Sequence, residues 1–367
     1  MYPLLRQLLF LLDPEQGHRL ILNVLRVAQR IPGLLPLLRA IYGVRSETLA
    51  SEVMGLTFPN PVGLAAGLDK NAECVPAFLG LGFGSVELGT VTPVAQPGNS
   101  RKRLFRLPRQ HALINRMGFP SVGVDRFLSN LRTVDKPGII GINIGKNKNT
   151  PNESAADDYL AAFRAVYSIA DYVTINVSSP NTPQLRALQT GEALGELLAT
   201  LKHEQIMLGK TRRVYVPIAL KIAPDLDSSE LETIAELALE HKIDAVIATN
   251  TTIDRSGVEH ELLAQETGGL SGLPLKEKTT EVIRTLYNVL KGRIPIIGVG
   301  GIENADDAWE KMVAGADLVQ VYTGFIYQGP ALVKRICRGL EKRIQVAGCK
   351  NLGEALEMAR SGVHLMR

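Results

Sequence analysis

Residues 176–183, NVSSPNTP, bring amide, hydroxyl and proline side chains together directly after an apolar run that is typical of a buried strand. Pro180 and Pro183 would end that strand, because proline has no N–H for a sheet and restricts its own backbone. They also limit how far the loop can move. Ser178 and Ser179 are therefore candidates for chemistry, and a structural turn is the alternative role for Ser178.

Polar or glycine-containing stretches also end the other apolar runs of the chain. A lysine such as Lys221, or an asparagine such as Asn143, is costly to bury inside an apolar run unless it has polar partners. In a barrel of parallel strands, the carboxyl ends of the strands and the following loops build the active site. The recurrence therefore predicts a ligand site. The residues concerned are Ala66-Gly67-Leu68-Asp69-Lys70, Thr90, Asn143, Asn176, Lys221, Thr249-Asn250-Thr251, Gly300-Gly301 and Tyr322-Thr323-Gly324.

The residue types at these ends restrict the ligand. Residues 300–301 and 322–324 follow the last two runs, where barrels commonly hold a phosphate on backbone N–H groups. Residues 268–272 are expected to form a third flexible loop rich in N–H groups. The absence of a carboxylate pair argues against glycoside hydrolysis, and no metal is expected because no metal motif is present. Amides and lysines suit an anionic, planar, hydrogen-bonding ligand, and both a flavin and a small carboxylate fit.

Eight short apolar runs, each followed by a helical stretch, must position these residues. Such alternation is typical of a parallel sheet covered on both sides, and eight units predict an α/β fold of the (β/α)8, or TIM, barrel type. A doubly wound open sheet is the alternative, but its GxGxxG fingerprint is missing. Residues 51–61 are expected to form a hairpin at the bottom of the barrel. The runs are 61–66, 85–90, 139–144, 172–177, 216–222, 245–250, 294–299 and 318–322.

The composition is that of a folded globular protein, with 45% hydrophobic and 21% charged residues among 367. Cys74, Cys337 and Cys349 lie far apart and predict neither a zinc site nor a disulfide framework, so a reducing cytosolic compartment is expected. Residues 1–45 contain six arginines and two acidic residues, which accounts for the whole net charge of +4. The remaining chain is neutral, which argues against nucleic-acid binding.

The first 45 residues are rich in leucine and arginine. Leucines recur at helical spacing in residues 4–12, and Asp13-Pro14 is typical of the start of a second helix, which would end at Pro32-Gly33. The longest apolar run, residues 8–12, is far below the roughly 18–20 residues of a membrane span. Two amphipathic helices of this kind suit the surface of a membrane. A helical hairpin packed on the body of the protein is the alternative, and one hairpin can do both.

Ten motifs, in order along the chain, resemble those of the class 2, quinone-dependent dihydroorotate dehydrogenases. The resemblance covers about residues 1–340. It implies an N-terminal segment for membrane contact and quinone access (1–45), an FMN-binding barrel (46–340) and a C-terminal extension (341–367). The motifs are NPVGLAAGLDKNAE (60–73), ELGTVTP (87–93), INRMGF (114–119), GINIGKNKNT (141–150), INVSSPNTP (175–183), LKIAPDL (220–226), IATNTT (247–252), TGGLSG (267–272), IIGVGGI (296–302) and VYTGF (321–325).

The resemblance implies oxidation of (S)-dihydroorotate to orotate with one FMN per chain, and electron transfer to a membrane quinone, in de novo pyrimidine biosynthesis. It also implies a monomer that lies peripherally on the cytoplasmic face of the inner membrane through residues 1–45. The implied FMN contacts are Ala66, Gly67, Leu68, Asp69, Lys70, Thr90, Asn143, Asn176, Lys221, Thr249, Gly272, Gly301, Tyr322 and Thr323. The implied dihydroorotate ligands are Lys70, Asn115, Arg116, Met117, Gly118, Phe119, Asn176, Asn181, Asn250 and Thr251.

The same resemblance assigns the catalytic base to Ser179. A serine hydroxyl is a weak base, so its proton must pass on through a threonine or a water. Lys70 would neutralise the substrate's carboxylate, and Lys221 would stabilise negative charge on the reduced flavin. His18 and Arg106 are candidate contacts for the quinone head group, and the alternative for His18 is an exposed helix residue.

Three other functions compete with this one. A class 1 enzyme using fumarate or NAD would carry a cysteine in place of Ser179, and none of the three cysteines lies near that loop. Another FMN barrel, such as a dihydrouridine synthase acting on tRNA, would require a basic surface that the neutral body lacks. A non-catalytic flavin-binding or membrane-docking protein is the third alternative.

Overall fold

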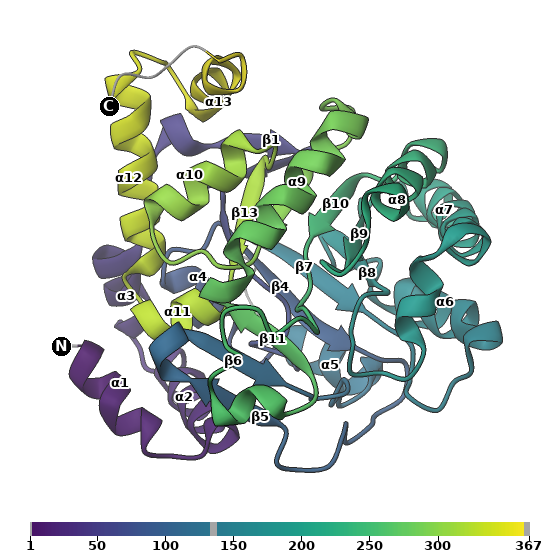
Figure 1. Cartoon of the computed structure of the whole chain (residues 1–367), viewed down its shortest axis with the longest axis horizontal. Helices are drawn as coiled ribbons and strands as arrows, with labels where there is room; N and C mark the ends of the chain where they lie inside the picture. The colour runs from purple at the N-terminus through teal and green to yellow at the C-terminus, as the bar shows by residue number, and fades with distance from the viewer. Residues whose placement is uncertain (1, 133–137, 363–367) are drawn as a thin grey trace.

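The computed structural model describes residues 2–132 and 138–362. Within them, eight parallel strands close into a barrel in the order β10-β12-β13-β3-β4-β7-β8-β9, which confirms the predicted (β/α)8 fold (Figure 1). Each strand falls on one of the predicted apolar runs. The strands are β3 (Val62–Leu64), β4 (Ser85–Val91), β7 (Ile139–Ile144), β8 (Tyr172–Asn176), β9 (Ile218–Ile222), β10 (Ala245–Ala248), β12 (Ile296–Val299) and β13 (Leu318–Val321).

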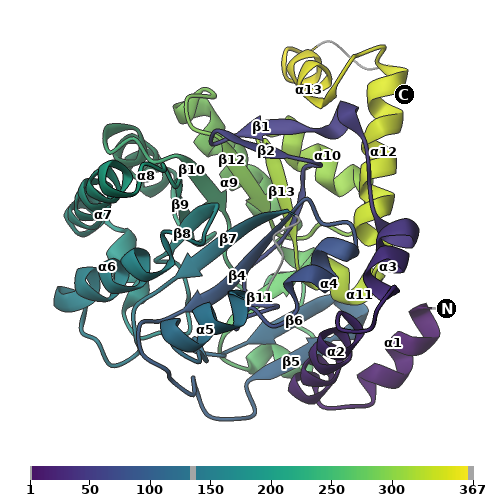
Figure 2. The same cartoon turned by 180° about the vertical axis from the view of Figure 1, so that it is seen from behind.

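Helices follow the strands and surround the barrel in both views of the molecule (Figures 1 and 2). Each crossover between parallel strands needs such a helix, because the chain must return to the starting edge of the sheet. The helices are α4 (Val75–Gly80), α5 (Val124–Leu131), α6 (Ala155–Val166), α7 (Gly191–Arg212), α8 (Ser228–Glu240), α9 (Lys276–Leu290), α10 (Ala305–Val313), α11 (Thr323–Gln328) and α12 (Leu332–Val346).

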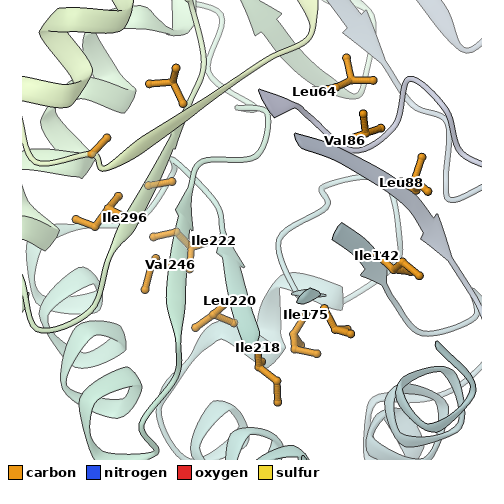
Figure 3. Close-up of a cluster of buried hydrophobic side chains, with 14 of the residues drawn as sticks. Leu64, Val86, Leu88, Ile142, Ile175, Ile218, Leu220, Ile222, Val246 and Ile296 are labelled. Atoms are coloured by element: carbon orange, nitrogen blue, oxygen red, sulfur yellow. The ribbon is translucent and has the colours of Figure 1, made fainter. Parts of the chain in front are cut away.

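Alternate residues of each barrel strand face the helices or the interior of the barrel. Leu220 and Ile222 of β9 belong to the large apolar cluster between strands and helices, part of which Figure 3 shows. Ala219 belongs to a second apolar cluster inside the barrel. Because side chains alternate along a strand, Lys221 shares the inner face with Ala219. The same alternation gives the inner face Glu87, Asn143, Asn176 and Gln320, which hydrogen-bond with one another there.

The predicted hairpin at the bottom of the barrel is confirmed. Strands β1 (Ser51–Val53) and β2 (Leu56–Phe58) pair in antiparallel fashion. Their buried side chains Val53 and Phe58 pack in the inner cluster against the first residues of β8, β10 and β13. The hairpin therefore closes the amino-terminal end of the barrel with apolar side chains, and the opposite end remains for a site.

A small antiparallel sheet covers part of the carboxyl end of the barrel. It consists of β5 (Leu104–Leu107), β6 (Ala112–Asn115) and β11 (Gly269–Gly272), with β6 in the middle. The expectation of a flexible loop at residues 268–272 was therefore wrong, because residues 269–272 pair with β6 as a strand and the N–H of Leu270 donates to the carbonyl of Thr252 (2.7 Å). A Cβ on Gly269 would lie 1.9 Å from the Thr251 hydroxyl, so close packing explains the absence of a side chain there.

The N-terminal segment forms three helices rather than the expected two: α1 (Tyr2–Phe10), α2 (Pro14–Ala28) and α3 (Leu34–Tyr42). Asp13 caps α2 as predicted, accepting hydrogen bonds from the backbone N–H groups of Glu15 (3.0 Å) and Gln16 (3.2 Å). The second helix ends before Pro32-Gly33, but the chain turns there into α3. Pro36 lies in the first turn of α3, where its missing N–H breaks no helical hydrogen bond.

These helices pack on the barrel with one face and expose apolar side chains on another. Arg6 Nη1 donates to the carbonyl of Tyr327 (2.8 Å), and the Glu15 carboxylate pairs with Arg103 (2.9 Å). No helix among residues 2–132 and 138–362 is long and apolar enough to cross a membrane. The exposed apolar residues of α1 to α3 and their connections are Leu4, Leu5, Leu8, Leu11, Leu12, Leu20, Val24, Val27, Ile31, Leu37 and Ile41.

The C-terminal part packs on the barrel as well. The expected boundary after residue 340 falls inside α12, and α13 (Leu352–Arg360) follows it (Figure 1). Leu340, Leu352 and Leu356 are buried in the large apolar cluster, so this part of the chain stabilises the barrel. Residues 363–367 of the expected extension lie outside the described residues.

Candidate active site

A cavity lies at the carboxyl ends of the barrel strands, between the strand ends, α2 and the β5-β6-β11 sheet. It brings together residues from most of the motifs singled out in the sequence. The predicted site residues that line it are His18, Ala66, Gly67, Lys70, Thr90, Asn115, Met117, Gly118, Phe119, Asn176, Ser179, Asn181, Lys221, Thr249, Asn250, Thr251, Gly272, Gly301, Tyr322 and Thr323.

The two neighbouring serines have different surroundings. Ser179 lines the cavity, and its Oγ accepts a hydrogen bond from the backbone N–H of Asn181 (3.2 Å). Ser178 is fully buried, donates to Asn176 Oδ1 (3.1 Å) and accepts from Asn250 Nδ2 (3.0 Å). The structure therefore gives Ser178 a role in holding two asparagines and leaves Ser179 facing the space where a ligand would lie.

Amide side chains form a connected group around the cavity. Asn181 Nδ2 donates to Asn115 Oδ1 (3.1 Å), which joins the loop after β8 to the end of β6. Asn176 Nδ2 donates to Thr90 Oγ1 (3.0 Å), and Asn250 Nδ2 donates weakly to Asn176 Oδ1 (3.3 Å). Because each amide has two donor hydrogens and an acceptor oxygen, this group can present both kinds of partner to a planar ligand.

Lys70 supplies a positive charge on one side of the cavity. Its ammonium donates to the carbonyl of Gly67, and its carbon chain is largely surrounded by protein. Burial and the nearby positive charge of Arg103 lower the pKa of Lys70 to about 8, although Glu15 and Asp69 act in the opposite direction. A carboxylate beside this group would restore a stable positive charge, so the position favours an anionic ligand.

His18 of α2 reaches the same cavity, so it is not an exposed helix residue. Its Nε2 lies 2.8 Å from the carbonyl oxygen of Leu68, which requires a proton on that nitrogen. Burial, followed by the repulsion from Lys70, lowers the pKa of His18 to about 4. The ring is therefore neutral near pH 7, and α2 is fastened to the loop after β3.

Lys221 and Glu87 form a buried pair on the inner face of the barrel. Lys221 Nζ lies 3.8 Å from Glu87 Oε1, and both side chains are almost fully buried. Glu87 also accepts hydrogen bonds from Asn143 Nδ2 (2.8 Å) and Gln320 Nε2 (2.7 Å). Lys221 lies in register beside Asn176 on the neighbouring strand, so its ammonium is held at the floor of the cavity.

The other end of the cavity is formed by glycines and hydroxyl groups after β12 and β13. Gly301 has a φ of +70°, and a Cβ there would lie 2.5 Å from the Cα of Lys276. Only glycine can therefore bring this backbone so close to the start of α9. Thr323 and Ser271 hydrogen-bond through their hydroxyls (2.9 Å), which joins β11 to the start of α11. Backbone and hydroxyl donors of this kind suit a phosphate.

Five predicted site residues lie outside the cavity lining, namely Leu68, Asp69, Asn143, Arg116 and Arg106. The carboxylate of Asp69 accepts from the N–H groups of Glu73 (2.9 Å) and Cys74 (2.7 Å) and shapes the loop after β3. Asn143 accepts a hydrogen bond from Thr90 Oγ1 (2.5 Å), so it holds a side chain that lines the cavity without lining the cavity itself.

The two arginines in this group bind other parts of the chain. Arg116 contacts Glu266 (2.5 Å), which joins the turn after β6 to the segment before β11. Arg106 donates to the carbonyls of Leu12 (2.7 Å) and Phe10 (3.3 Å) and lies over the Phe10 ring. Arg106 therefore holds the end of α1, whereas His18 reaches the cavity.

Several residues at or near the site were not singled out from the sequence. Glu87 interrupts the apolar run 85–90, a signal that could have been used. Asn99 lies in an unremarkable loop, yet its Nδ2 donates to the carbonyls of Arg116 and Asn181 (both 3.1 Å). It thereby connects the two loops that carry predicted substrate ligands, and such a contact between distant loops leaves no local signal in a sequence.

The chain matches the family model described as dihydroorotate dehydrogenase over residues 48–344. Two relatives named dihydroorotate dehydrogenase (quinone) cover nearly the whole chain. The relative from Idiomarina loihiensis is 54% identical over 336 residues, which are 92% of this chain and 99% of its own length. The relative from Nitrosomonas eutropha is 55% identical over 347 residues, 95% of this chain and 99% of its own length.

A solved structure agrees with these relatives. The crystal structure of DHODH from Eimeria tenella in complex with ferulenol superposes with a TM-score of 0.86 at 38% sequence identity. The match covers 94% of this chain and 95% of that chain.

Proposed function

Because the chain belongs to the dihydroorotate dehydrogenase family, we propose that Ser179 is the group that takes up the proton in its reaction. The enzyme oxidises dihydroorotate to orotate in pyrimidine biosynthesis, with FMN as cofactor and a quinone as electron acceptor. A proton leaves C5 of the substrate and a hydride leaves C6, so a C5=C6 double bond forms. The two electrons pass on to the quinone, which becomes a quinol by taking up two protons.

The residues of the cavity fit FMN in their chemistry. Lys221, Asn176 and Thr90 offer a positive charge and hydrogen-bonding groups that suit a polar, planar ring. The backbone around Gly301 and Thr323 suits a phosphate, as argued above. When bound, FMN supplies the acceptor for the hydride. In this proposal Lys221 stabilises negative charge next to the ring, and its pairing with Glu87 keeps the ammonium in place.

The observation that carries the assignment of the base is the different placement of the two serines. Ser179 faces the cavity, whereas the hydroxyl of Ser178 already donates to Asn176 and accepts from Asn250. Thr182, three residues further on, is buried, and its hydroxyl has no hydrogen-bond partner within the described residues. Thr182 is therefore a suitable next carrier for the proton that Ser179 must release.

The same cavity supplies the binding groups for the substrate. Lys70 would neutralise the carboxylate, and Asn115, Asn181 and Asn250 would bind the ring amides. The turn that contains Gly118 and Phe119 lines the cavity and would cover the ring. The hydrogen bond between Asn181 and Asn115 supports these roles, because it fixes the donors and acceptors that a planar ligand needs in one arrangement.

We further propose that α1 to α3 form the quinone-access segment and lie on the cytoplasmic face of the inner membrane. Exposed leucines on α1 and recurring arginines in this segment suit the surface of a membrane. Helix α2 connects this segment to the site, because its His18 lines the cavity. Arg106 would act by holding the end of α1. We also propose that the protein is a monomer, as its resemblance to the class 2 enzymes implies.

The two serines can be distinguished by one experiment. Anaerobic mixing of the purified holoenzyme with dihydroorotate bleaches the yellow flavin absorbance and so reports the oxidation of substrate without the quinone. We expect Ser179→Ala to retain FMN but to slow this bleaching by about 10²- to 10⁴-fold, the usual contribution of a general base. Ser178→Ala should disturb the site less. The reverse order of the two effects would overturn the assignment of Ser179.

A further inference from the structure

Arg186 connects three loops of the active-site end and has no role in the function described so far. It lies on the 3-10 helix Leu185–Gln189, which follows the serine-bearing loop. Its Nε donates to the carbonyl of Ser178 (3.1 Å), and its Nη2 donates to the carbonyl of Thr251 (2.8 Å). Its Nη1 donates to the Asp225 carboxylate (2.8 Å). The three partners follow β8, β10 and β9, which are adjacent in the barrel.

Asp225 is the fixed end of this arrangement. Besides Arg186, its carboxylate accepts from the hydroxyl of Thr252, the N–H of Ile253 (3.0 Å) and the ammonium of Lys278 on α9 (2.8 Å). Burial raises the pKa of Asp225, but these hydrogen bonds outweigh burial and the net shift is downward. The carboxylate is therefore ionised at neutral pH and holds Arg186 by a charge-assisted bond, which is stronger than a neutral one.

We propose that Arg186 and Asp225 are positioning residues that set the distance between the base and the substrate. The inference rests on the proposed role of Ser179. Arg186 binds the carbonyl of the residue directly before Ser179 and, on its other side, the carbonyl of Thr251, a predicted substrate ligand. In the reaction the C5–H bond breaks and its electron pair forms the C5=C6 bond as a hydride leaves C6. The C5 proton goes to Ser179 Oγ, which passes its own hydroxyl proton on. A misplacement of about 1 Å at such a step costs roughly 10²-fold in rate.

The planar guanidinium is what makes this connection possible. It directs three donors along fixed directions, whereas lysine carries a compact charge on a flexible chain. Arg186→Lys would keep a positive charge next to Asp225 but could not reach Ser178 and Thr251 at the same time. The substitution therefore separates loss of the connection from loss of charge, and Asp225→Asn tests the same connection from its other end.

The test uses the full-length holoenzyme and anaerobic stopped-flow bleaching of the flavin, with unlabelled, C5-deuterated and C6-deuterated dihydroorotate. For Arg186→Lys at saturating substrate we expect a rate lower by about 10- to 100-fold. The isotope effect for C5–D should rise and that for C6–D should stay near its wild-type value, because only the base is displaced. The dissociation constant of orotate, titrated by the flavin spectrum, should change much less than the rate. Asp225→Asn should show the same pattern, and the double variant should be little worse than either single variant.

Arg255→Lys is the matched control. Arg255 also binds loop carbonyls, those of Ala264, Glu266 and Gly268, but neither Ser178 nor Thr251. It should leave the C5 isotope effect at the wild-type value. The same isotope pattern in Arg255→Lys would overturn the proposal, because general loosening of the loops would then suffice. So would wild-type isotope effects in both Arg186→Lys and Asp225→Asn, or a loss of orotate affinity as large as the loss of rate.

Failure of this inference can be told apart from failure of the proposed function. If Ser179→Ala abolishes bleaching while Arg186→Lys and Asp225→Asn behave as wild type, Ser179 remains the base and the positioning role is wrong. If Ser179→Ala bleaches at the wild-type rate, the assignment of the base is wrong, and the inference that depends on it is overturned with it.

Discussion

Lys221 and Glu87 face each other at 3.8 Å inside the barrel, and neither side chain has appreciable contact with solvent. Removing one partner of a buried pair leaves an uncompensated charge, which typically costs about 3–5 kcal/mol. We therefore expect Glu87→Ala to lower the free energy of unfolding by this amount, measured by urea denaturation with excess FMN. The control is Glu204→Ala, which breaks the pair with the exposed Arg164 and should cost at most about 1 kcal/mol. Equal losses in the two variants would contradict the importance of burial.

The rate of substrate oxidation should rise with pH between about 6 and 9. A serine hydroxyl is far from ionised in this range, so proton removal becomes easier as the acceptor of its proton loses its own proton. The measurement is anaerobic flavin bleaching at saturating dihydroorotate, which excludes the quinone step. Thr182→Val should lower the alkaline rate without affecting FMN binding. A flat profile in the wild-type enzyme would argue against a serine base.

Binding of the product should weaken at high pH for a different reason. The pKa of Lys70 is lowered to about 8, so in the free enzyme the ammonium loses its charge above that pH. Since orotate is a carboxylate, its dissociation constant should rise above pH 8, approaching tenfold per pH unit. The dissociation constant is obtained by titrating the flavin spectrum. The Lys70→Met variant should bind orotate weakly at every pH, and its dissociation constant should no longer depend on pH in this range. If the dissociation constant of the variant still rises above pH 8 as in the wild type, another group causes the pH dependence.

His18 should make the folded enzyme sensitive to acid. Its pKa is about 4 in the folded state, below the ordinary value of 6.5, so between these values the unfolded chain binds more protons. Stability therefore rises with pH in this window and is lost as the pH falls from about 6.5 towards 4. The slope of the melting temperature against pH should be smaller in His18→Gln. His203→Gln, on the exposed side of α7, should keep the wild-type slope.

The barrel and most of its lining could be predicted from the sequence, because both depend on local patterns. Apolar runs identify the strands. A polar residue inside or just after such a run, such as Lys221 or Thr90, is expected at the carboxyl end of the barrel, where polar partners are present. The loop containing Ser178 and Ser179 was found in this way. Which of the two serines faces the cavity depends on Asn250, which follows β10 and fixes Ser178 together with Asn176 at the end of β8.

The parts that escaped prediction depend on contacts between distant segments. Glycines at 269 and 272 look like a loop, and only their pairing with β6 makes them a strand. Arg186 and Asn99 have no distinctive sequence pattern around them, and each is singled out only by hydrogen bonds to loops that are distant in the sequence. Helix α3 was missed because Pro36 and the preceding Pro32-Gly33 resemble a break, whereas a proline in a first turn is compatible with a helix.

The exposed leucines of α1 and of the turn that follows it should be required for membrane binding and not for substrate oxidation. Leu4, Leu8 and Leu11 are 69%, 65% and 84% exposed, and each buried apolar side chain would add to attachment at the membrane interface. We expect the triple Leu→Ser variant to lose sedimentation with anionic lipid vesicles. It should also lose activity with a long-chain quinone held in those vesicles, but keep its activity with a water-soluble quinone and its rate of flavin bleaching.

The control for this variant is Leu262→Ser, because Leu262 is 92% exposed but lies on the 3-10 helix Leu262–Gln265 before β11. It should bind vesicles as the wild type does, which would show that the effect depends on the N-terminal helices and not on surface hydrophobicity in general. If the triple variant still sediments with vesicles, the exposed face of α1 is not the membrane contact. If it also loses flavin bleaching, the helices mainly support the cavity, as the contacts of His18 and Arg6 with the barrel would allow.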